Sequence, residues 1–360
     1  MTFLKNICLI LFSLFIGMVP NHVMAQQSSV IMAEFIFDTA SFAQCHASTI
    51  AESHGDLVAA WFGGTAEKNP DVEIWLSRKE NNHWSVPVSV ANGIQNDGKR
   101  YPCWNPVLFQ VPDGPLLLFY KVGPSPDSWW GELKRSPDGG TTWSTAEHLP
   151  EGILGPIKDK PVLLPDKTLL CGSSTEDNGW KIHFERTADQ GKTWIKTESI
   201  PSGKKIQIIQ PSILIYPGNR LQALCRSKEG SIMSTWSDDM GRNWSDIEVT
   251  ELPNPNSGID AVTLKSGYQL LVYNHASVKK GNWGGPRSPL NVAMSPDGIH
   301  WSSIVVLEDQ DGEFSYPAVI QTSDGMIHIT YTWKRKKIKH VVLDPAKFKP
   351  RPMTDGTWQD

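Results

Sequence analysis

Six polar residues stand at or near the start of six short apolar segments that recur along the chain. They are His46, Asn105, Lys160, Gln210, Asp260 and Tyr316. If the segments are strands around one axis, their leading ends face a common central pocket. An imidazole, two amides, an ammonium, a carboxylate and a phenol can together bind a polar ligand and move a proton. The alternative is that strand ends border loops and are often polar for that reason alone.

Further charged and aromatic groups fall where the same pocket and its rim would lie. The ends of the following segments offer Lys121, Arg226, His275 and Arg335, and the loops offer Asp71, Arg100, Arg287, Glu313, Trp104, Trp129, Trp130 and Trp283. Arg can hold a carboxylate through two parallel hydrogen bonds, and Trp can stack on a sugar ring. The combination indicates a sugar that bears a carboxylate. The run Lys334-Arg335-Lys336-Lys337 is expected to form a solvated face.

A repeated turn shows which elements must position these residues. The turn has Ser or Thr, then Asp, then Gly, and ends on Trp. Its copies are 136–143, 187–194, 237–244 and the shorter 295–301, with a degenerate copy from Ser77 to Trp84. Asp accepts hydrogen bonds from nearby backbone N–H groups, and Gly adopts positive φ. We therefore expect these Asp residues to build turns rather than to act as catalytic acids, and each Trp to fold back between sheets.

The spacing of the repeat predicts the fold. The Trp residues fall at 84, 143, 194, 244 and 301, and six strand pairs interleave with them, so the chain has six units of about 55 residues. Each unit has room for four strands, and long amphipathic helices are not evident. This pattern predicts an all-β, six-bladed β-propeller with four-stranded antiparallel blades over residues 26–345, followed by a C-terminal extension over 346–360. The early strand Val30–Phe37 should complete the last blade and close the ring.

Composition excludes several classes of protein. The 360 residues carry a formal charge of −4, which lacks the basic excess of a nucleic-acid binder. Cys45, Cys103, Cys171 and Cys225 permit disulfides in an exported chain, but a core of this size requires none. No CxxC pair suggests zinc. We expect no metal, no cofactor and a monomer.

The N-terminus is typical of an export signal. Lys5 precedes an apolar run from Ile7 to Val19, and Val23-Met24-Ala25 offers a cleavage site after Ala25. The run is too short to span a bilayer, and no other stretch is long enough. We therefore expect a signal peptide over residues 1–25 and a periplasmic or secreted protein without a membrane span.

With its Asp-box turns and six strand pairs, the chain resembles the sialidase-like proteins with BNR (Asp-box) repeats. The resemblance implies a Tyr nucleophile at Tyr316, carboxylate-binding Arg residues at Arg226 and Arg287, and an acid/base Asp at Asp71. This chain departs from the family where His46 replaces the first Arg and Gln210 replaces the Glu that assists the Tyr. Since Gln cannot take a proton from a phenol, Glu313 is a substitute. The substrate-binding candidates are Arg226, Arg287, Gln210, Asn105, Lys160, Asp260, Lys121, His275 and Trp104; the catalytic candidates are Asp71, Tyr316, His46 and Glu313.

Three functions follow, and the first is favoured. One is an exo-acting glycoside hydrolase for a glycan with a sialic or uronic sugar. Another is a polysaccharide lyase, in which Gln210, Asn105 and Arg226 neutralise a uronate and His46 or Tyr316 acts as base. The last is a glycan-binding propeller without catalysis. A glycan is the expected partner in each case.

Overall fold

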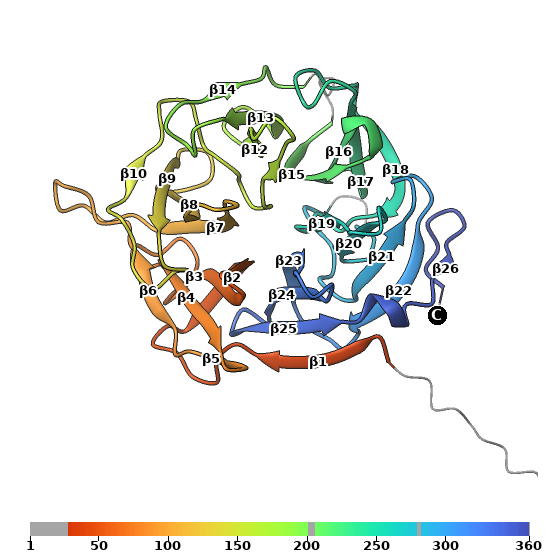
Figure 1. The fold of residues 1–360 in the computed structure, drawn as a ribbon, viewed down its shortest axis with the longest axis horizontal. Helices are drawn as coiled ribbons and strands as arrows, with labels where there is room; N and C mark the ends of the chain where they lie inside the picture. Colours follow the sequence, from red (N-terminus) through yellow and green to blue (C-terminus); the bar gives the residue numbers. More distant parts are fainter. Residues whose placement is uncertain (1–27, 201–205, 279–281, 360) are drawn as a thin grey trace, which may run out of the picture.

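Six antiparallel sheets surround a central axis in the computed structural model, which describes residues 28–200, 206–278 and 282–359 (Figure 1). Four sheets have four strands and two have an additional strand. The predicted all-β propeller with six antiparallel blades is therefore confirmed. Neighbouring innermost strands contact one another around the axis, as β2 does with β7 and β23.

The blades follow one another along the chain, and each runs from an inner to an outer strand. Blade 1 contains β2 (Gln44–Ser53), β3 (Asp56–Gly64), β4 (Glu73–Glu80), β5 (His83–Trp84) and β6 (Val88–Ala91). Blade 2 contains β7 (Cys103–Gln110), β8 (Leu116–Val122), β9 (Trp130–Ser136) and β10 (Glu147–His148). Blade 3 contains β11 (Val162–Leu163), β12 (Leu169–Thr175), β13 (Lys181–Thr187) and β14 (Ile195–Lys196).

The second half of the ring is built in the same way. Blade 4 contains β15 (Ile208–Ile215), β16 (Leu221–Ser227), β17 (Ser231–Ser237) and β18 (Glu248–Pro253), with a 3₁₀ turn, η1 (Pro217–Asn219), between its first two strands. Blade 5 contains β19 (Asp260–Thr263), β20 (Gln269–Tyr273), β21 (Leu290–Ser295), β22 (Ser302–Glu308) and β26 (Arg351–Pro352). Blade 6 contains β23 (Phe314–Gln321), β24 (Ile327–Trp333), β25 (Lys337–Leu343) and β1 (Val30–Phe35).

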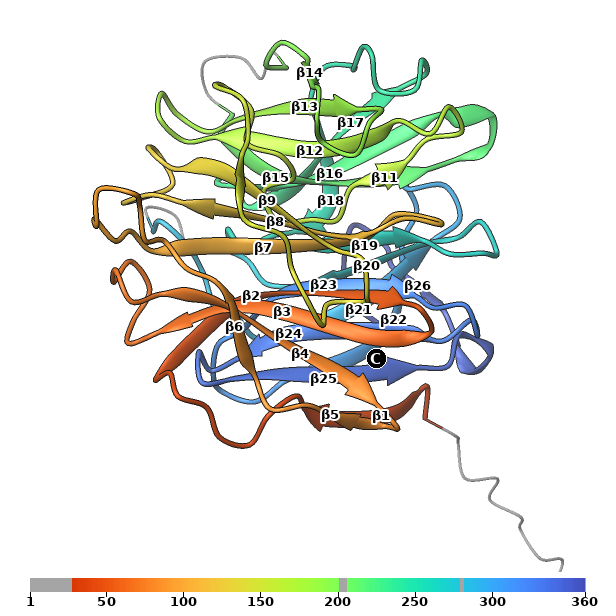
Figure 2. The same cartoon turned by 60° about the vertical axis from the view of Figure 1, so that its left-hand side comes forward.

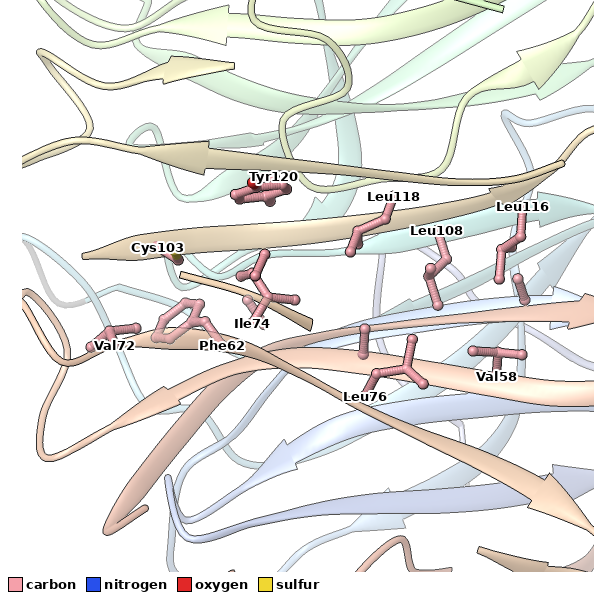
Figure 3. Close-up of a cluster of buried hydrophobic side chains, with 14 of the residues drawn as sticks. Val58, Phe62, Val72, Ile74, Leu76, Cys103, Leu108, Leu116, Leu118 and Tyr120 are labelled. Carbon is pink, nitrogen blue, oxygen red and sulfur yellow. The ribbon is translucent and has the colours of Figure 1, made fainter. Parts of the chain in front are cut away.

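The second strand of each blade is mostly buried because neighbouring blades cover it from both sides. Every residue of β8 is buried, as is every residue of β16. Figure 3 shows the cluster between blades 1 and 2, where Leu76 and Ile74 meet Leu108 and Leu118. Such short, largely apolar segments are typical of buried strands rather than of helices. Tight turns join them: His54 and Gly55 both have positive φ between β2 and β3, as a type I′ hairpin requires.

The ring is closed by the N-terminal strand, as predicted. β1 pairs antiparallel with β25 and so becomes the outer strand of blade 6 (Figure 2). Its Glu34 carboxylate accepts hydrogen bonds from Lys79 Nζ (2.6 Å) and Trp84 Nε1 (3.0 Å) of blade 1, and it contacts His340 Nδ1 (2.9 Å) of blade 6. At the other end of the chain, a 3₁₀ turn, η2 (Pro345–Lys347), is followed by β26, which pairs with β22.

The Asp residues of the repeated turns are structural, as predicted. Asp138 Oδ1 accepts from the Thr142 backbone N–H at 2.8 Å, and Ser136 Oγ accepts from the Gly140 N–H at 2.7 Å. The hydrogen bonds from Thr142 hold the pKa of Asp138 at about 2. The same pattern recurs at Asp189, Asp239 and Asp297. These hydrogen bonds stabilise the turn and keep the carboxylate ionised at neutral pH.

The Trp that ends each turn packs against the preceding blade, which confirms its predicted place between sheets. Trp244 of blade 4 stacks on Phe184 of blade 3 with ring centroids 3.8 Å apart. Trp194 of blade 3 meets Phe119 of blade 2 at 6.1 Å. The degenerate copy behaves alike, since Trp84 of blade 1 packs on blade 6. The repeat thus fixes the spacing of the blades as well as their turns.

Several predictions concern the chain outside the propeller or the chemistry of its cysteines. The predicted signal peptide and its cleavage site lie outside the described residues. In the described ranges, no helix is long and apolar enough to cross a membrane, and no cluster of three His, Cys, Asp or Glu side chains could hold a metal. Cys45, Cys103, Cys171 and Cys225 are buried and free. Burial raises the pKa of all four thiols.

Candidate active site

Four inner strands carry a β-bulge at the same point, close to the axis. The register shifts between His46 and Thr49, between Trp104 and Val107, between Ile209 and Ser212, and between Ser315 and Ala318. A residue with positive φ lies in each bulge; these are Ala47, Asn105, Gln210 and Tyr316. A bulge redirects the side chains around it, and positive φ is unfavourable for a residue with a Cβ. In the first blade this backbone position belongs to Ala47 rather than to the polar residue before it.

Tyr316 is the centre of the arrangement. Its hydroxyl accepts a hydrogen bond from Arg226 Nη1 at 2.7 Å and a longer one from Gln210 Nε2 at 3.4 Å. The ring of His46 packs on the Tyr316 ring with centroids 4.1 Å apart. Three blades that are distant in sequence therefore meet at one phenol, and the structure brings these four candidate residues into contact.

Arg226 is fixed from several sides. Its Nε donates to Asn256 Oδ1 at 2.8 Å, and its guanidinium lies over the rings of Trp180 (5.1 Å) and Trp283 (5.8 Å). The side chain is buried, whereas Trp283 is 64% exposed. The two aromatic faces attract the guanidinium cation, and the hydrogen bonds of Arg226 fix the guanidinium plane. Arg226 is therefore preorganised to bind an anion.

Two further guanidinium groups adjoin this site. Arg287 lies within the electrostatic range of Arg226, Glu313 and Arg335. Its burial is the largest cause that lowers its pKa to about 10, and repulsion by Arg226 is the next. Its Nη1 is buried and has no hydrogen-bond partner among the described residues. A buried donor without an acceptor is costly, so this nitrogen is suited to meet a ligand oxygen.

Arg335 lies in the run predicted to form a solvated face, yet it is partly buried and paired. Its Nε donates to Glu313 Oε1 at 2.9 Å, and its Nη1 contacts the Glu67 carboxylate. It also contributes to the low pKa of His46. Its position just after β24 predicted a place near the site, whereas its three neighbouring lysines predicted an exposed surface.

His46 cannot replace a cation in its present surroundings. Burial lowers its pKa well below the ordinary value, and the charges of Arg335, Arg287 and Arg226 lower it further. Nδ1 lies 2.9 Å from Thr332 Oγ1. The ring is therefore neutral at physiological pH.

The carboxyl groups of the site differ in their roles. Glu313 accepts from Arg335 and from Ser315 Oγ (3.1 Å), and among the described residues none of its contacts is with Tyr316. Glu176, at the end of β12, was not singled out from the sequence. Burial raises its pKa, and the nearby Arg226 opposes this effect. Glu176 is thus a partly buried carboxyl group beside the arginine that contacts the phenol.

Asp71 lies in the loop between β3 and β4. Its Oδ2 accepts from the Thr65 backbone N–H at 2.9 Å and from the Thr65 hydroxyl, which lowers its pKa below the ordinary value. Oδ1 is buried without a hydrogen-bond partner in the part of the chain that the structure describes. The group is ionised in the free protein and has one oxygen available to a ligand or a water.

Lys160 and Asp260 pair with each other. Lys160 Nζ lies 2.9 Å from Asp260 Oδ2, and the same carboxylate accepts from Ser212 Oγ (2.9 Å) and from the Val319 N–H (2.8 Å). These contacts join blades 3, 4, 5 and 6 near the axis. We assign the pair to the scaffold beneath the site.

Four other candidates have contacts of their own away from the phenol oxygen. Lys121 is fully buried, donates to Pro156 O at 2.6 Å, and has its pKa lowered to about 7 by burial. Trp104 donates to Gly123 O at 2.8 Å and packs on Phe62. His275 contacts the Tyr273 hydroxyl and Trp358, and Asn105 is buried in the bulge of β7. Among the described residues, none of these contacts reaches Tyr316 or Arg226.

Comparison with known proteins agrees with this fold. The family model of the BNR repeat-like domain matches residues 55–329, which is more than half of the chain. A search of curated proteins found no match. Among solved structures, a protein of unknown function from Dyadobacter fermentans is similar at 16% identity with a TM-score of 0.72, over 88% of this chain and 98% of that one.

Two sialidases also share the fold. The Hadza microbial sialidase Hz136 is 15% identical with a TM-score of 0.72, over 88% of this chain and 69% of its own. A mutant of NanB sialidase from Streptococcus pneumoniae is 12% identical with a TM-score of 0.70, over 87% and 71%. At these identities the likeness concerns the fold. With its Asp-box turns, six blades and matching family model, the chain belongs to the family of proteins with a BNR repeat-like domain.

Proposed function

We propose that the protein is an exo-acting glycoside hydrolase that removes a terminal sialic or uronic sugar from a glycan. The observation that carries this proposal is the cluster of Arg226 and Arg287 beside Tyr316, with Arg335 near His46 and Arg287. Arg226 is already oriented by Asn256, and the buried Nη1 of Arg287 lacks an acceptor among the described residues. Guanidinium groups bind carboxylates in bidentate fashion, so the cluster favours a sugar that carries one.

Tyr316 would face the anomeric carbon of the bound sugar. The hydrogen bond and positive charge of Arg226 favour negative charge on the phenol oxygen, which can attack or stabilise that carbon. Gln210 cannot accept the phenol proton, and the lowered pKa of His46, whose ring packs on Tyr316, makes that imidazole a weak base, so the phenol proton would pass to a water in the pocket. Asp71 would carry a proton to the leaving oxygen, and water would then complete hydrolysis.

A polysaccharide lyase is the second candidate, and the state of His46 favours it. A neutral imidazole packed against a phenol resembles the base and acid that elimination requires. In this version a base takes the proton at C5 of a uronate, and the bond from C4 to the leaving oxygen breaks as a C4–C5 double bond forms. Gln210 and Arg226 would neutralise the carboxylate.

A panel of acidic glycans separates these reactions. Purified protein is incubated with sialosides, uronic-acid oligosaccharides and rhamnose-capped uronates, and released sugar and ultraviolet absorbance are recorded. A released acidic sugar without absorbance supports the proposed hydrolase, whereas an absorbing unsaturated product supports the lyase. Binding without turnover on any member contradicts both enzymes and leaves a glycan-binding protein.

We also propose that the protein acts outside the cytoplasm as a monomer, after cleavage behind Ala25. The sequence of the first 25 residues supports export, and extended glycans are substrates met at or beyond the cell surface. N-terminal sequencing of protein purified from the culture medium or periplasm tests the cleavage point. A mature chain that begins elsewhere than Gln26 would contradict it.

A further inference from the structure

Lys158 is a buried cation that lies beside Tyr316 and has no part in the proposed reaction. It belongs to the segment that leads into β11 of blade 3. The Ile157 N–H of this segment donates to Gly172 O of β12 at 3.1 Å, so the segment continues the pairing of the inner strand with β12. The sequence pattern predicts Lys160 for the site, but it is Lys158 that lies next to the phenol ring.

The Lys158 ammonium is held by three acceptors. Its Nζ donates to Pro317 O at 2.6 Å, to Ile259 O at 2.6 Å and to Asp159 Oδ1 at 2.7 Å. An ammonium has three N–H groups and no acceptor, so these contacts engage all of its donors. A neutral amine has only two N–H groups and would leave one buried acceptor unmatched. Lys158 is therefore a cation that joins blades 3, 5 and 6.

One of the three acceptors belongs to the bulge that carries the phenol. Pro317 follows Tyr316 in β23, and Tyr316 has a φ of 52°. This conformation is unfavourable for a residue with a Cβ and persists only where surrounding contacts hold it. The hydrogen bond from Lys158 to the adjacent carbonyl is one such contact. A Cβ added to Gly258 would lie 3.1 Å from Lys158 Cε and 3.2 Å from Tyr316 Cδ2, so the lysine and the phenol ring pack against the same glycine.

The positive charge of Lys158 also reaches the site. Its Nζ lies 5.9 Å from the centre of the Tyr316 ring, and the guanidinium carbon of Arg226 lies 5.8 Å from that centre. Burial is the largest cause that lowers the pKa of His46, and Lys158 is one of four cations that lower it further. Two cations beside one phenol favour negative charge on its oxygen. This charge matters here because Gln210 cannot take the phenol proton.

Asp159 neutralises the charge of Lys158 only at higher pH. The Asp159 carboxyl group is buried, and its Oδ2 has no hydrogen-bond partner among the described residues. Burial raises the pKa of Asp159 to about 7; the charge of Asp260 adds to this rise, whereas the charges of Lys158 and Lys160 oppose it. A carboxyl group is neutral below its pKa, so Lys158 has no full counter-ion below about pH 7.

We propose that Lys158 is a positioning residue for Tyr316, which holds the bulge through Pro317 O and supplies a positive charge beside the phenol ring. As part of catalysis the proposal rests on the proposed function, but the contacts with Tyr316 do not require turnover. The role is separate from substrate binding. Arg226 is oriented by Asn256, and Asn256 Nδ2 has a contact of its own with Trp283 O at 2.7 Å. Loss of Lys158 should therefore slow the reaction and preserve the affinity for an acidic sugar.

The first test compares Lys158→Met with Lys134→Met at about pH 6, where Asp159 is largely neutral. Lys134 donates to Val90 O at 2.6 Å, so the control removes an ammonium from a backbone carbonyl elsewhere in the ring. Lys158→Met should lower kcat on the best acidic glycan by about 10- to 100-fold, as misplacement of a reacting group does, and should change the Kd for acidic monosaccharides by less than about threefold. Lys134→Met should change neither. An unchanged kcat, or an equal loss of kcat and affinity, would overturn the proposal.

A second measurement requires neither turnover nor a folded variant. The lysine ammonium groups of isotope-labelled wild-type protein are followed by NMR. The Lys158 ammonium, assigned through its side-chain couplings, should exchange slowly with water, and its side chain should show a nuclear Overhauser effect to the Tyr316 ring. Rapid exchange without that effect would overturn the proposal even if the protein turns over a glycan. Slow exchange and the Overhauser effect in a protein that turns over no acidic glycan would refute the proposed function and leave Lys158 as the residue that holds Tyr316.

Discussion

Replacement of Arg226 by Met should abolish most of the affinity for an acidic sugar. The change removes a guanidinium that is buried, flanked by Trp180 and Trp283, and bonded to Tyr316 and Asn256. Truncating one partner of a buried, hydrogen-bonded charge pair costs about 2–5 kcal/mol of binding free energy. Allowing for remaining attraction by the other two arginines, we expect about 2–4 kcal/mol, or roughly 30- to 1,000-fold in Kd.

The same substitution has a separate cost in stability. Asn256 is fully buried, and its Oδ1 would lose the donor that Arg226 Nε supplies at 2.8 Å. Leaving such an acceptor unsatisfied destabilises the fold by about 1–3 kcal/mol. Denaturant unfolding therefore accompanies the binding assay, so that only folded protein is compared.

Calorimetric titration with acidic monosaccharides measures the effect, and Arg220→Met is the matched control. Arg220 directly precedes β16, whereas Arg226 lies near the end of that strand. The Arg220 guanidinium lies 4.3 Å from the centre of the Trp236 ring, so the control also removes an arginine from a tryptophan face, but outside the site. Arg220→Met should bind as the wild type does. If folded Arg226→Met protein binds within about threefold of wild type, the arginine cluster is not the carboxylate site.

The remaining predictions test chemistry and scaffold separately. Tyr316→Phe should lower kcat by at least about 100-fold with little effect on binding, and an unchanged kcat would remove the phenol from the mechanism. Because hydrogen bonds from Thr65 lower the pKa of Asp71, its acid form accumulates only at low pH; kcat/KM should rise as pH falls from about 8 to about 5, and a profile that falls instead would exclude Asp71 as the acid. Asp260→Asn breaks the buried pair with Lys160 and should destabilise the fold by about 3–5 kcal/mol, whereas wild-type stability would show that the pair is dispensable. Glu34→Gln should destabilise by about 1–2 kcal/mol at neutral pH, discounted for partial exposure. Since the folded pKa of Glu34 is lowered from 4.5 to about 2, that difference should shrink as pH falls through this range, and a difference independent of pH would contradict the assignment.

The blades could be predicted because their signals are local. The hydrogen bonds of Asp138 and Asp189 lie within turns of a few residues, so the sequence alone displays them. The closing strand was also predictable, since Val30–Phe35 is an apolar segment left over after six complete pairs. The pairing of β26 with β22 was not, because Arg351–Pro352 is short and polar and its partner is distant in sequence.

The site was only partly predictable, for a geometric reason. In blade 1 the bulge position that corresponds to Tyr316 of blade 6 is occupied by Ala47 and not by His46. This depends on how β2 pairs with β3, which the sequence does not show. In the sequence, a polar residue at a strand end that binds a ligand cannot be told from one that pairs with another strand end. Lys160 and Asp260 satisfy each other, whereas Arg226 contacts Tyr316. Whether a polar strand end is free to bind a ligand depends on its contacts with other blades. These contacts form only when the ring of blades is closed.

The most direct test of the account is the fate of oxygen during turnover. Protein is incubated with the best acidic glycan in water enriched in heavy oxygen, and the products are weighed by mass spectrometry. We predict one heavy oxygen at the anomeric carbon of the released acidic sugar, with this product lost in Tyr316→Phe and greatly reduced in Arg226→Met. An unsaturated sugar without heavy oxygen, or label that forms equally well in both variants, would contradict hydrolysis at the Tyr316 site.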